Sequence, residues 1–566
     1  MWRRLARRRF QLPRFEPYVP RATDPKTFWL DTERDDLVEE VVRRIVARHG
    51  GDPEAVEAVL SDAVYHEIQR LEAQHDEESR ARLGDWRELV RALPTLSFDR
   101  RVQTLEDRTR RMAYDVAGNF DPRVYRFAAK VVPTVLASVM HPGSLLPTEG
   151  SLDPELRSLV VAQGDIERLR RISEVATVVY VPTHASNLDS LALAWALYRE
   201  GLPPVVYGAG KNLFTNPIIS FFMHNLGAYR IDRRIRAQLY KDVLKTYSAV
   251  LLERGYHSLF FPGGTRSRSG EVEKKLKLGL AGTAVEAFAR NAVRGRTRPM
   301  VFVPTTINYT LVLEAETLIS DYLHQQGRSR YIIDDDEFSR IDRWVAFFHR
   351  LREHEGACIL RFAEPIDPFG NPVDAEGRSI GPGGRVLDPT RYLRFEGSLT
   401  LDHEREHAYT EALGADFVRA FHENTVVMPS QAVAHVLYRW LVRATPGVEP
   451  FARLRRKGEL AVPRSEVTAA LGRLRDRLLE LEAKGALRVS PWLASASPDR
   501  VIDRVLAEWA GYHLTTIAAQ RDGAIVAEDP RLLLYYGNRL RPWALELAEP
   551  GEERVARELL AEVWEA

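Results

Sequence analysis

Apolar side chains in the first part of the chain lie three or four positions apart. In residues 34–50 they are Leu37, Val38, Val41, Val42, Ile45 and Val46. A stripe with this period indicates a helix that buries one face, and the glycine at the end of the segment stops it. Because residues 55–74 repeat the pattern, we predict that residues 34–118 are helical, with no catalytic grouping among them.

From about residue 170 the pattern changes to short runs of β-branched residues that alternate with helical stretches. We predict strands at 176–182, 203–209, 257–262, 299–309 and 357–365. This alternation is typical of an α/β fold with a mostly parallel sheet flanked by helices. Ligands of such sheets bind beyond the carboxyl ends of the strands, so the residues that follow these runs matter most.

Helical periodicity returns after a segment rich in Gly, Pro and Asp, residues 367–389, which predicts a long loop. A chain of 566 residues is longer than one hydrophobic core usually serves. We therefore predict four parts: a helical N-terminal region with a basic tail at 1–118, an α/β domain at 119–366, a Gly/Pro-rich loop at 367–400 and a helical C-terminal region at 401–566.

The composition argues against several classes of protein. The 80 Lys and Arg nearly balance the 79 Asp and Glu, whereas a nucleic-acid binder usually shows a strong basic excess. No run approaches the ~20 apolar residues of a spanning helix. The single cysteine, Cys358, excludes an internal disulfide framework and a cluster of thiols around a metal. Five arginines among the first nine residues form either a solvated tail or a basic contact with anionic lipid.

The first candidate for chemistry follows the strand predicted at 176–182. His184 stands just beyond the strand, and Asp189 comes five positions later. With Ser186 or Asn187 as the N-cap, Asp189 falls in the first turn of the next helix. Its carboxylate can then hold one imidazole nitrogen while the other takes a proton from a substrate hydroxyl. By spacing alone, a capping Asp beside an incidental His remains an alternative.

The second candidate is the stretch SLFFPGGTRSRSG at residues 258–270, where a strand leads into a glycine turn. A turn dense in small residues, hydroxyls and guanidinium groups can cradle an anion. For any single arginine the alternative is an ordinary surface salt bridge. The residues that would form the cradle are Gly264, Thr265, Arg266, Ser267 and Arg268.

Four blocks in chain order resemble the glycerol-phosphate acyltransferase superfamily, and specifically its bacterial PlsB-like glycerol-3-phosphate acyltransferases. The first is VPTHASNLDSLALAWALY, which carries the His-x4-Asp pair. The second is GLPPVVYGAGKNLF with LGAYRIDRR, the third FFPGGTRSRSG, and the fourth VPTTINYTLVLEAETL. The resemblance covers roughly residues 120 to 440.

This resemblance implies O-acyl transfer in phospholipid synthesis. His184, held by Asp189, would deprotonate an acceptor hydroxyl that attacks the thioester of acyl-CoA or acyl carrier protein. Arginine suits a phosphorylated acceptor because its planar fork meets two phosphate oxygens. The residues implied for the acceptor phosphate are Arg233, Arg266, Arg268 and Lys277, with Ser267 and the amides of the glycine turn; Pro304 would help to shape the acyl pocket. No cofactor, metal or covalent acyl-enzyme is implied.

Two positions depart from the family pattern. The family usually has Arg where this chain has Asp232, and Glu where it has Gly263. The Glu is associated with acceptor binding, so the acceptor stays open between glycerol-3-phosphate and lysophosphatidate or another alcohol. A catalytically weakened lipid-binding homologue is a further alternative. For the enzyme we expect a peripheral position on the cytoplasmic face of the cell membrane, because the product is an amphiphile.

A rival motif lies at LDHEREHAYT, where His403, Glu404 and His407 match the zinc-protease pattern His-Glu-x-x-His. The two intervening residues are charged, whereas a helix beneath a buried zinc site needs apolar neighbours. His422 and Glu423 follow at a suitable distance but without a glycine turn. We therefore interpret the motif as a solvated, charged helix face.

Overall fold

The computed structural model describes residues 18–74, 77–129, 160–214, 217–326, 358–510, 513 and 515–545. The chain forms two compact units. The first consists of Met1–Ala128 and Val205–Leu251, and the second of Ala129–Pro204 and Leu252–Ala566. The predicted division into four parts stays a prediction.

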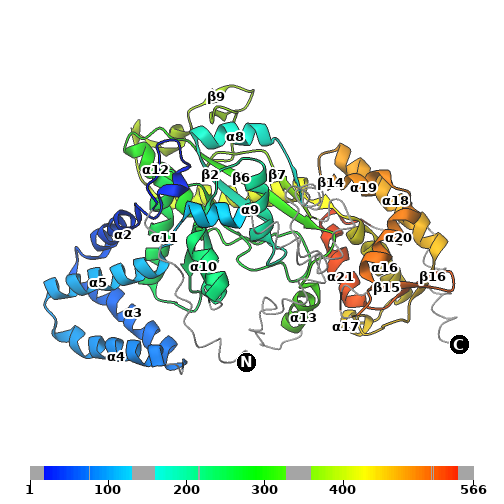
Figure 1. The fold of residues 1–566 in the computed structure, drawn as a ribbon, viewed down its shortest axis with the longest axis horizontal. Helices are drawn as coiled ribbons and strands as arrows, with labels where there is room; N and C mark the ends of the chain where they lie inside the picture. Colours follow the sequence, from blue (N-terminus) through cyan, green and yellow to red (C-terminus); the bar gives the residue numbers. More distant parts are fainter. Residues whose placement is uncertain are drawn as a thin grey trace. The chain divides into compact units, whose positions relative to one another are not determined.

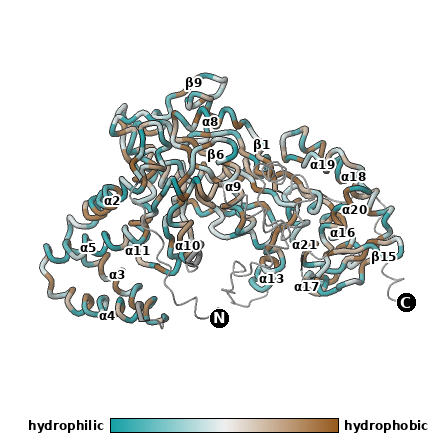
Figure 2. The backbone as a smooth tube through the Cα atoms, viewed as in Figure 1, coloured by the Kyte–Doolittle hydropathy of each residue, from teal (hydrophilic) through white to brown (hydrophobic). Residues whose placement is uncertain are grey.

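Helices dominate the first unit, as predicted for residues 34–118. After the short helix η1 (Lys26–Trp29) come α2 (Arg34–His49), α3 (Pro53–Glu72), α4 (Glu77–Ala92), η2 (Leu93–Thr95) and α5 (Phe98–Val116). Each α-helix carries brown apolar and teal polar positions, as expected for helices that bury one face (Figure 2). Further described elements of the unit include β3 (Val206–Gly210), η3 (Lys211–Phe214), α10 (Pro217–Asn225), β4 (Ala228–Ile231) and most of α11 (Gln238–Glu253).

A mostly parallel sheet of seven strands forms the α/β part of the described chain, which confirms the predicted fold class. Its five strands in the second unit follow the order β1 (Val160–Gln163), β7 (Cys358–Phe362), β6 (Met300–Tyr309), β2 (Thr177–Pro182) and β5 (Ser258–Leu259). Only β6 and β7 run antiparallel among the pairs in this set. The other two strands, β3 and β4, lie in the first unit and pair in parallel.

The position of β2 decides where the candidate site forms. Its parallel neighbours are β6 on one side and β5 on the other. Parallel strands end at the same edge of a sheet, so the segments that follow β2, β5 and β6 meet there. The strand β5 keeps only two residues of the predicted run 257–262, and the turn around Gly263 follows it.

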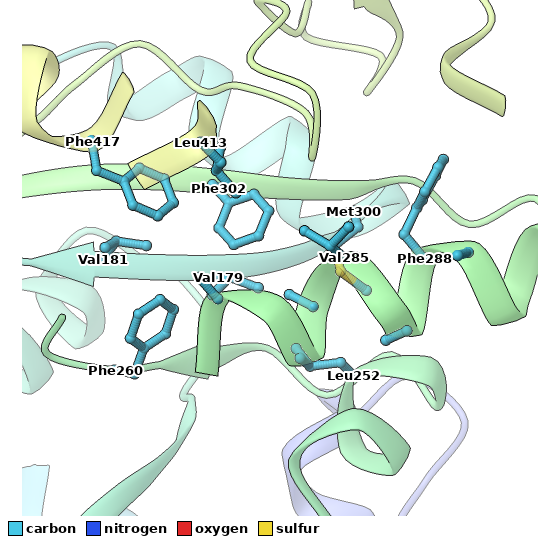
Figure 3. Packing of buried hydrophobic residues seen from close by; sticks show 14 of the residues in the cluster. Val179, Val181, Leu252, Phe260, Val285, Phe288, Met300, Phe302, Leu413 and Phe417 are labelled. Atoms are coloured by element: carbon cyan, nitrogen blue, oxygen red, sulfur yellow. The ribbon is translucent and has the colours of Figure 1, made fainter. Parts of the chain in front are cut away.

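The core of the second unit lies between the sheet and two helices, α12 (Gly279–Val293) and α15 (His403–Asn424). Figure 3 shows Val179 and Val181 of β2 on the side of the sheet that faces α12, with Phe302 of β6 beside them. Both strands are buried along their whole length, as expected when helices cover both faces of a parallel sheet. Other helices described next to these strands in the sequence are α8 (Ile166–Val175), α9 (Asp189–Arg199) and α13 (Ala315–Gln326), of which α9 packs on β1 and β7.

The segment 367–400, predicted as a loop, contains two short hairpins. These are β8 (Ser379–Ile380) with β9 (Val386–Leu387), and β10 (Arg394–Phe395) with β11 (Ser398–Leu399), separated by η5 (Pro389–Leu393). Each strand has only two residues, which is too short to produce a periodic signal.

The C-terminal region is mostly helical, with short strands that were not predicted. Besides α15 it holds α16 (Pro429–Ala444), α17 (Pro450–Arg453), α18 (Arg464–Ala483), α19 (Pro491–Ser495), α20 (Pro498–Trp509), α21 (Pro530–Gly537) and η6 (Asn538–Trp543) (Figure 1). An antiparallel sheet adds β13 (Ala461–Pro463), β16 (Ala524–Ala527) and β15 (Ala518–Arg521), in that order, and β12 (Val426–Val427) pairs with β14 (Arg488–Val489). These strands have two to four residues, too few for the sequence pattern to separate them from loops.

This C-terminal region is hydrogen-bonded to the segments that follow β5 and β6. The amide of Asn538 donates to the carbonyl of Ser269 at 2.9 Å. The hydroxyl of Tyr536 accepts a bond from the backbone N–H of Val312 at 3.0 Å. The region therefore supports both segments at the edge of the sheet.

One expectation falls outside the described residues: the basic N-terminal tail, whose five arginines lie among the first nine residues. Among the helices that the structure describes, none combines the length and the apolar composition that a bilayer crossing requires.

The contact between the two regions predicts a position-specific loss of stability. Gly270 has φ +79°, and a Cβ there would lie 2.0 Å from the carbonyl oxygen of Tyr535. Gly523 has the same φ of +79° with nothing within 4 Å of its Cβ position. We expect G523A to cost about 1 kcal/mol of backbone strain, and G270A to cost about 1–3 kcal/mol more through the clash. Thermal unfolding of both variants tests this, and equal losses would contradict it.

Candidate active site

The turn after β2 forms around the buried carboxylate of Asp189. Its Oδ2 accepts hydrogen bonds from the Nδ1–H of His184 at 2.8 Å and from the backbone N–H groups of Ala185 at 2.7 Å and Ser186 at 3.0 Å. The contact expected between His184 and Asp189 is therefore present. Asp189 is the first residue of α9, so its predicted place in the first turn is confirmed.

The predicted N-cap was wrong, because α9 follows Leu188 rather than Ser186 or Asn187. The hydroxyl of Ser186 accepts a bond from the N–H of Leu188 at 3.2 Å and donates to Glu314 at 2.8 Å. Ser186 thus stabilises the turn before the helix instead of capping the helix itself.

The imidazole of His184 is oriented for proton transfer. Its Nδ1 is bound to Asp189, which leaves Nε2 as the ring nitrogen that can accept a proton. The ring stacks on Phe261 with 4.2 Å between centroids and 26° between planes. The side chain is 19% exposed, so a substrate can reach it while its orientation stays fixed.

Glu314, which the sequence reasoning missed, ties this turn to the arginine of the glycine loop. Its Oε1 accepts a bond from the N–H of Asn187 at 2.9 Å, and the Nη1 of Arg266 lies 3.3 Å from the same oxygen. Burial raises the pKa of Glu314, while Arg266 and the hydrogen bonds oppose the rise. Since Glu314 follows β6 and Arg266 follows β5, one carboxylate joins the three segments at the edge of the sheet.

Glu273, also missed, holds the backbone of the proposed base. Its Oε1 accepts a bond from the N–H of His184 at 2.8 Å. Its Oε2 is inaccessible and has no hydrogen-bond partner among the described residues. Burial raises the pKa of Glu273 to about 8, although the bond from His184 and the charge of Arg539 lower it.

The glycine loop lies directly against the His184 turn. The N–H of Ser267 donates to the carbonyl of His184 at 2.7 Å, while the Ser267 hydroxyl donates to the carbonyl of Glu271 at 2.9 Å. Gly264 has φ +70°, and a Cβ there would lie 2.7 Å from the Cδ of Lys277. The structure therefore brings Ser267, Gly264 and Lys277 into one loop beside His184.

Three further predicted site residues, Thr265, Arg268 and Pro304, also lie in the second unit. Thr265 is exposed and Arg268 is half-buried in the same loop. Pro304 is buried in β6 opposite Val181 of β2, next to the strand end that leads to His184. The roles of these three residues stay predictions.

Arg233 and Asp232 belong to the first unit. Asp232 is buried and accepts two side-chain bonds from Arg234, each 3.0 Å long. Burial alone would raise the pKa of Asp232, but Arg234 and Lys211 lower it overall. The carboxylate at this unusual position is thus satisfied within its own unit. Arg233 is exposed, and its role in binding phosphate stays a prediction.

The rival motif and the cysteine have structural explanations. His403 and His407 lie in the first turns of α15, with side chains 80% and 74% exposed, as expected for a solvated helix face. In the described ranges no group of three or more His, Cys, Asp or Glu is arranged to hold a metal ion. Cys358 is buried in β7, and burial raises the pKa of its thiol, which keeps it in the unreactive form.

Comparisons with known proteins point to one enzyme class. Residues 165–308 match the family model described as Acyltransferase. The chain is 31% identical over 202 residues to a glycerol-3-phosphate acyltransferase of Pseudomonas paraeruginosa, covering 36% of this chain and 22% of that protein. It is 32% identical over 229 residues to the enzyme of that name in Haemophilus ducreyi, covering 40% and 26%. The matches thus span about a quarter of the length of these curated relatives.

Among solved structures, the chain overlaps with the 1-acyl-sn-glycerophosphate (LPA) acyltransferase of Thermotoga maritima. The overlap covers 52% of this chain and 92% of that one, with 16% identity and a TM-score of 0.24. An overlap of that quality supports no conclusion about this protein.

The raised pKa of Glu273 predicts a pH-dependent stability. Between pH 4.5 and about 8 the unfolded chain has lost this proton and the folded chain keeps it, so stability falls as the pH rises through that window. E273Q cannot titrate there. We expect the unfolding free energy of E273Q, relative to wild type, to increase by about 3 kcal/mol between pH 5 and pH 8. Denaturant unfolding at the two pH values measures this, and parallel pH profiles would contradict it.

Proposed function

We propose that this chain, whose residues 165–308 match the acyltransferase family model, moves a fatty acyl group from acyl-CoA or acyl carrier protein to glycerol-3-phosphate. The observation that carries the proposal is the His184–Asp189 pair, which leaves Nε2 of His184 for a substrate beside a loop with Arg266 and Lys277. A base next to cationic side chains suits an alcohol that carries a phosphate.

The proposed reaction needs only groups of the site and its two substrates. His184 Nε2 takes the proton of the acceptor hydroxyl as its oxygen attacks the thioester carbonyl. The C–O bond forms, the C–S bond breaks, and the leaving thiolate recovers the proton from the imidazolium. Asp189 stabilises the imidazolium, which is the role of the carboxylate in hydrolase triads. Because transfer is direct, no enzyme nucleophile takes part, which agrees with the buried state of Cys358.

Arg266 is the strongest candidate for gripping the acceptor phosphate. One of its nitrogens is directed at Glu314, while its side chain remains 26% exposed. A guanidinium has five N–H donors, so a single ion pair leaves donors for phosphate oxygens. Glu314 thereby fixes the arginine beside the turn that holds the base.

The proposal extends to a peripheral position at the cytoplasmic face of the cell membrane. The product of acyl transfer carries a fatty chain and a phosphate, so it partitions into a bilayer surface. Lysophosphatidate remains an alternative acceptor, because it offers the same combination of hydroxyl and phosphate. The intact His184–Asp189 pair disfavours a lipid-binding homologue without activity.

An acceptor panel tests the proposal. Purified protein should release thiol from acyl-CoA with glycerol-3-phosphate but not with glycerol. H184A should lower kcat about 100-fold or more, because the general base is lost. H403A, which removes an exposed histidine of α15, should leave the rate unchanged and serves as the matched control. Full activity of H184A would refute the mechanism. If the enzyme acylated lysophosphatidate but not glycerol-3-phosphate, lysophosphatidate would become the proposed acceptor.

The phosphate role of Arg266 has its own test. R266A should raise the acceptor KM about tenfold, because a charge-assisted hydrogen bond to phosphate is lost. The same variant should weaken competitive inhibition by inorganic phosphate and leave the acyl-donor KM unchanged. The acceptor KM of R266K, which keeps the positive charge but not the planar guanidinium, should lie between the values of the wild type and R266A. If R266A changed kcat alone, Arg266 would serve only to hold Glu314.

A further inference from the structure

Position 263 carries no side chain, and the carboxylate of Glu273 occupies the space that one would fill. A Cβ at Gly263 would lie 2.8 Å from Oε1, 2.9 Å from Cδ and 3.1 Å from Oε2 of Glu273. Each distance is shorter than an ordinary van der Waals contact. Because the φ of Gly263 is not in the left-handed region, the glycine is required here for space rather than for backbone conformation.

Only one oxygen of this carboxylate is used. Oε1 accepts the bond from the N–H of His184, while Oε2 is shielded from solvent without a partner in the described part of the chain. An inaccessible carboxylate oxygen that makes no hydrogen bond lowers stability. The positive charge of Arg539 lowers the pKa of Glu273. The Nη2 of this arginine, however, donates its hydrogen bond to Asn308 at 3.0 Å and not to Glu273. The unpaired oxygen therefore lies beside the turn that holds the proposed base. In the absence of a ligand, burial keeps this carboxyl protonated, whereas a hydroxyl that donates to Oε2 favours the ionised form, as the bond from His184 and the charge of Arg539 already do.

We propose that Glu273 binds the acceptor through Oε2, which accepts a hydrogen bond from the hydroxyl of glycerol-3-phosphate that is not acylated. This inference rests on the proposed function and deepens it by assigning a second contact to the acceptor. Three points then fix a small, flexible molecule: its phosphate at Arg266, one hydroxyl at Glu273 and the reacting hydroxyl at His184. Holding the reacting groups in this way lowers the entropic cost of the reaction.

E273Q isolates the proposed contact. The oxygen of Gln can still accept the bond from the N–H of His184. Its NH₂ group can only donate to the acceptor hydroxyl, in a neutral hydrogen bond about half as strong as one to a carboxylate. The probe is 3-hydroxypropyl phosphate, which has the phosphate and one hydroxyl of glycerol-3-phosphate but lacks the second hydroxyl. Its inhibition constant against glycerol-3-phosphate can be measured whether or not it is acylated.

We expect the wild-type enzyme to bind glycerol-3-phosphate about tenfold or more tightly than the deoxy probe. E273Q should lose most of this preference by raising the KM for glycerol-3-phosphate, with the KM for the acyl donor unchanged. A purely structural role through His184 would weaken both acceptors alike or lower kcat alone. The preference is a ratio, so it does not depend on the fraction of active protein.

A second pair of variants tests whether Gly263 serves Glu273. G263A should displace the carboxylate and reduce the same preference, although residue 263 itself makes no proposed contact. In an E273A background, G263A should have no further effect on the preference, because the side chain that it displaces is gone. Such non-additivity is the signature of two residues that act through one contact.

The outcomes separate this inference from the function on which it rests. If the wild type acylates glycerol-3-phosphate and E273Q keeps the preference over the deoxy probe, the inference is overturned and the proposed function stands. If E273Q weakens both acceptors equally, Glu273 is a positioning residue for His184 and the acceptor contact is refuted. If the wild type acylates no phosphorylated alcohol, the proposed function and the inference fail together.

Discussion

The candidate site depends on one buried carboxylate oxygen, Oδ2 of Asp189. It accepts three hydrogen bonds, one from the ring of His184 and two from the next backbone amides, of Ala185 and Ser186. The backbone can present these donors to a single acceptor only in a tight turn. The same interaction therefore shapes the turn after β2 and orients the imidazole. Two glutamates hold the outside of this turn, Glu273 at the N–H of His184 and Glu314 at the N–H of Asn187.

Three carboxylates in so small a volume are expensive to bury unless hydrogen bonds and cations offset the loss of hydration. Arg266 pairs with Glu314, and the buried Arg539 attracts the carboxylates of both Glu273 and Asp189. Arg539 comes from η6, near the end of the described chain. The C-terminal region thus contributes to the electrostatics of the site as well as to its support, which no pattern in the sequence indicates.

The sequence was sufficient where the signal is local. The alternation of strands and helices predicted the sheet, because β2 and β6 are long, buried and rich in β-branched residues. The five-residue spacing predicted the contact between His184 and Asp189, since both belong to one turn. Strands of two to four residues, such as β4 and β12, escaped prediction because so short a run shows no period. The assignment of the N-cap failed for a related reason: Ser186 uses its hydroxyl inside the turn and toward Glu314.

By itself, the sequence determined the α/β fold, the base with its carboxylate, and the order of the blocks that resemble acyltransferases. Only the tertiary structure decided which other groups reach that base. Glu273 and Glu314 look like ordinary charged residues in the sequence, yet they bind the His184 turn across separations of 89 and 127 positions. Bonds within a turn follow from local backbone geometry, whereas these contacts exist because β5 and β6 pair with β2 in parallel and end beside it. For the same reason Gly263, a departure from the family pattern in sequence, becomes in the fold the space that a neighbouring carboxylate fills.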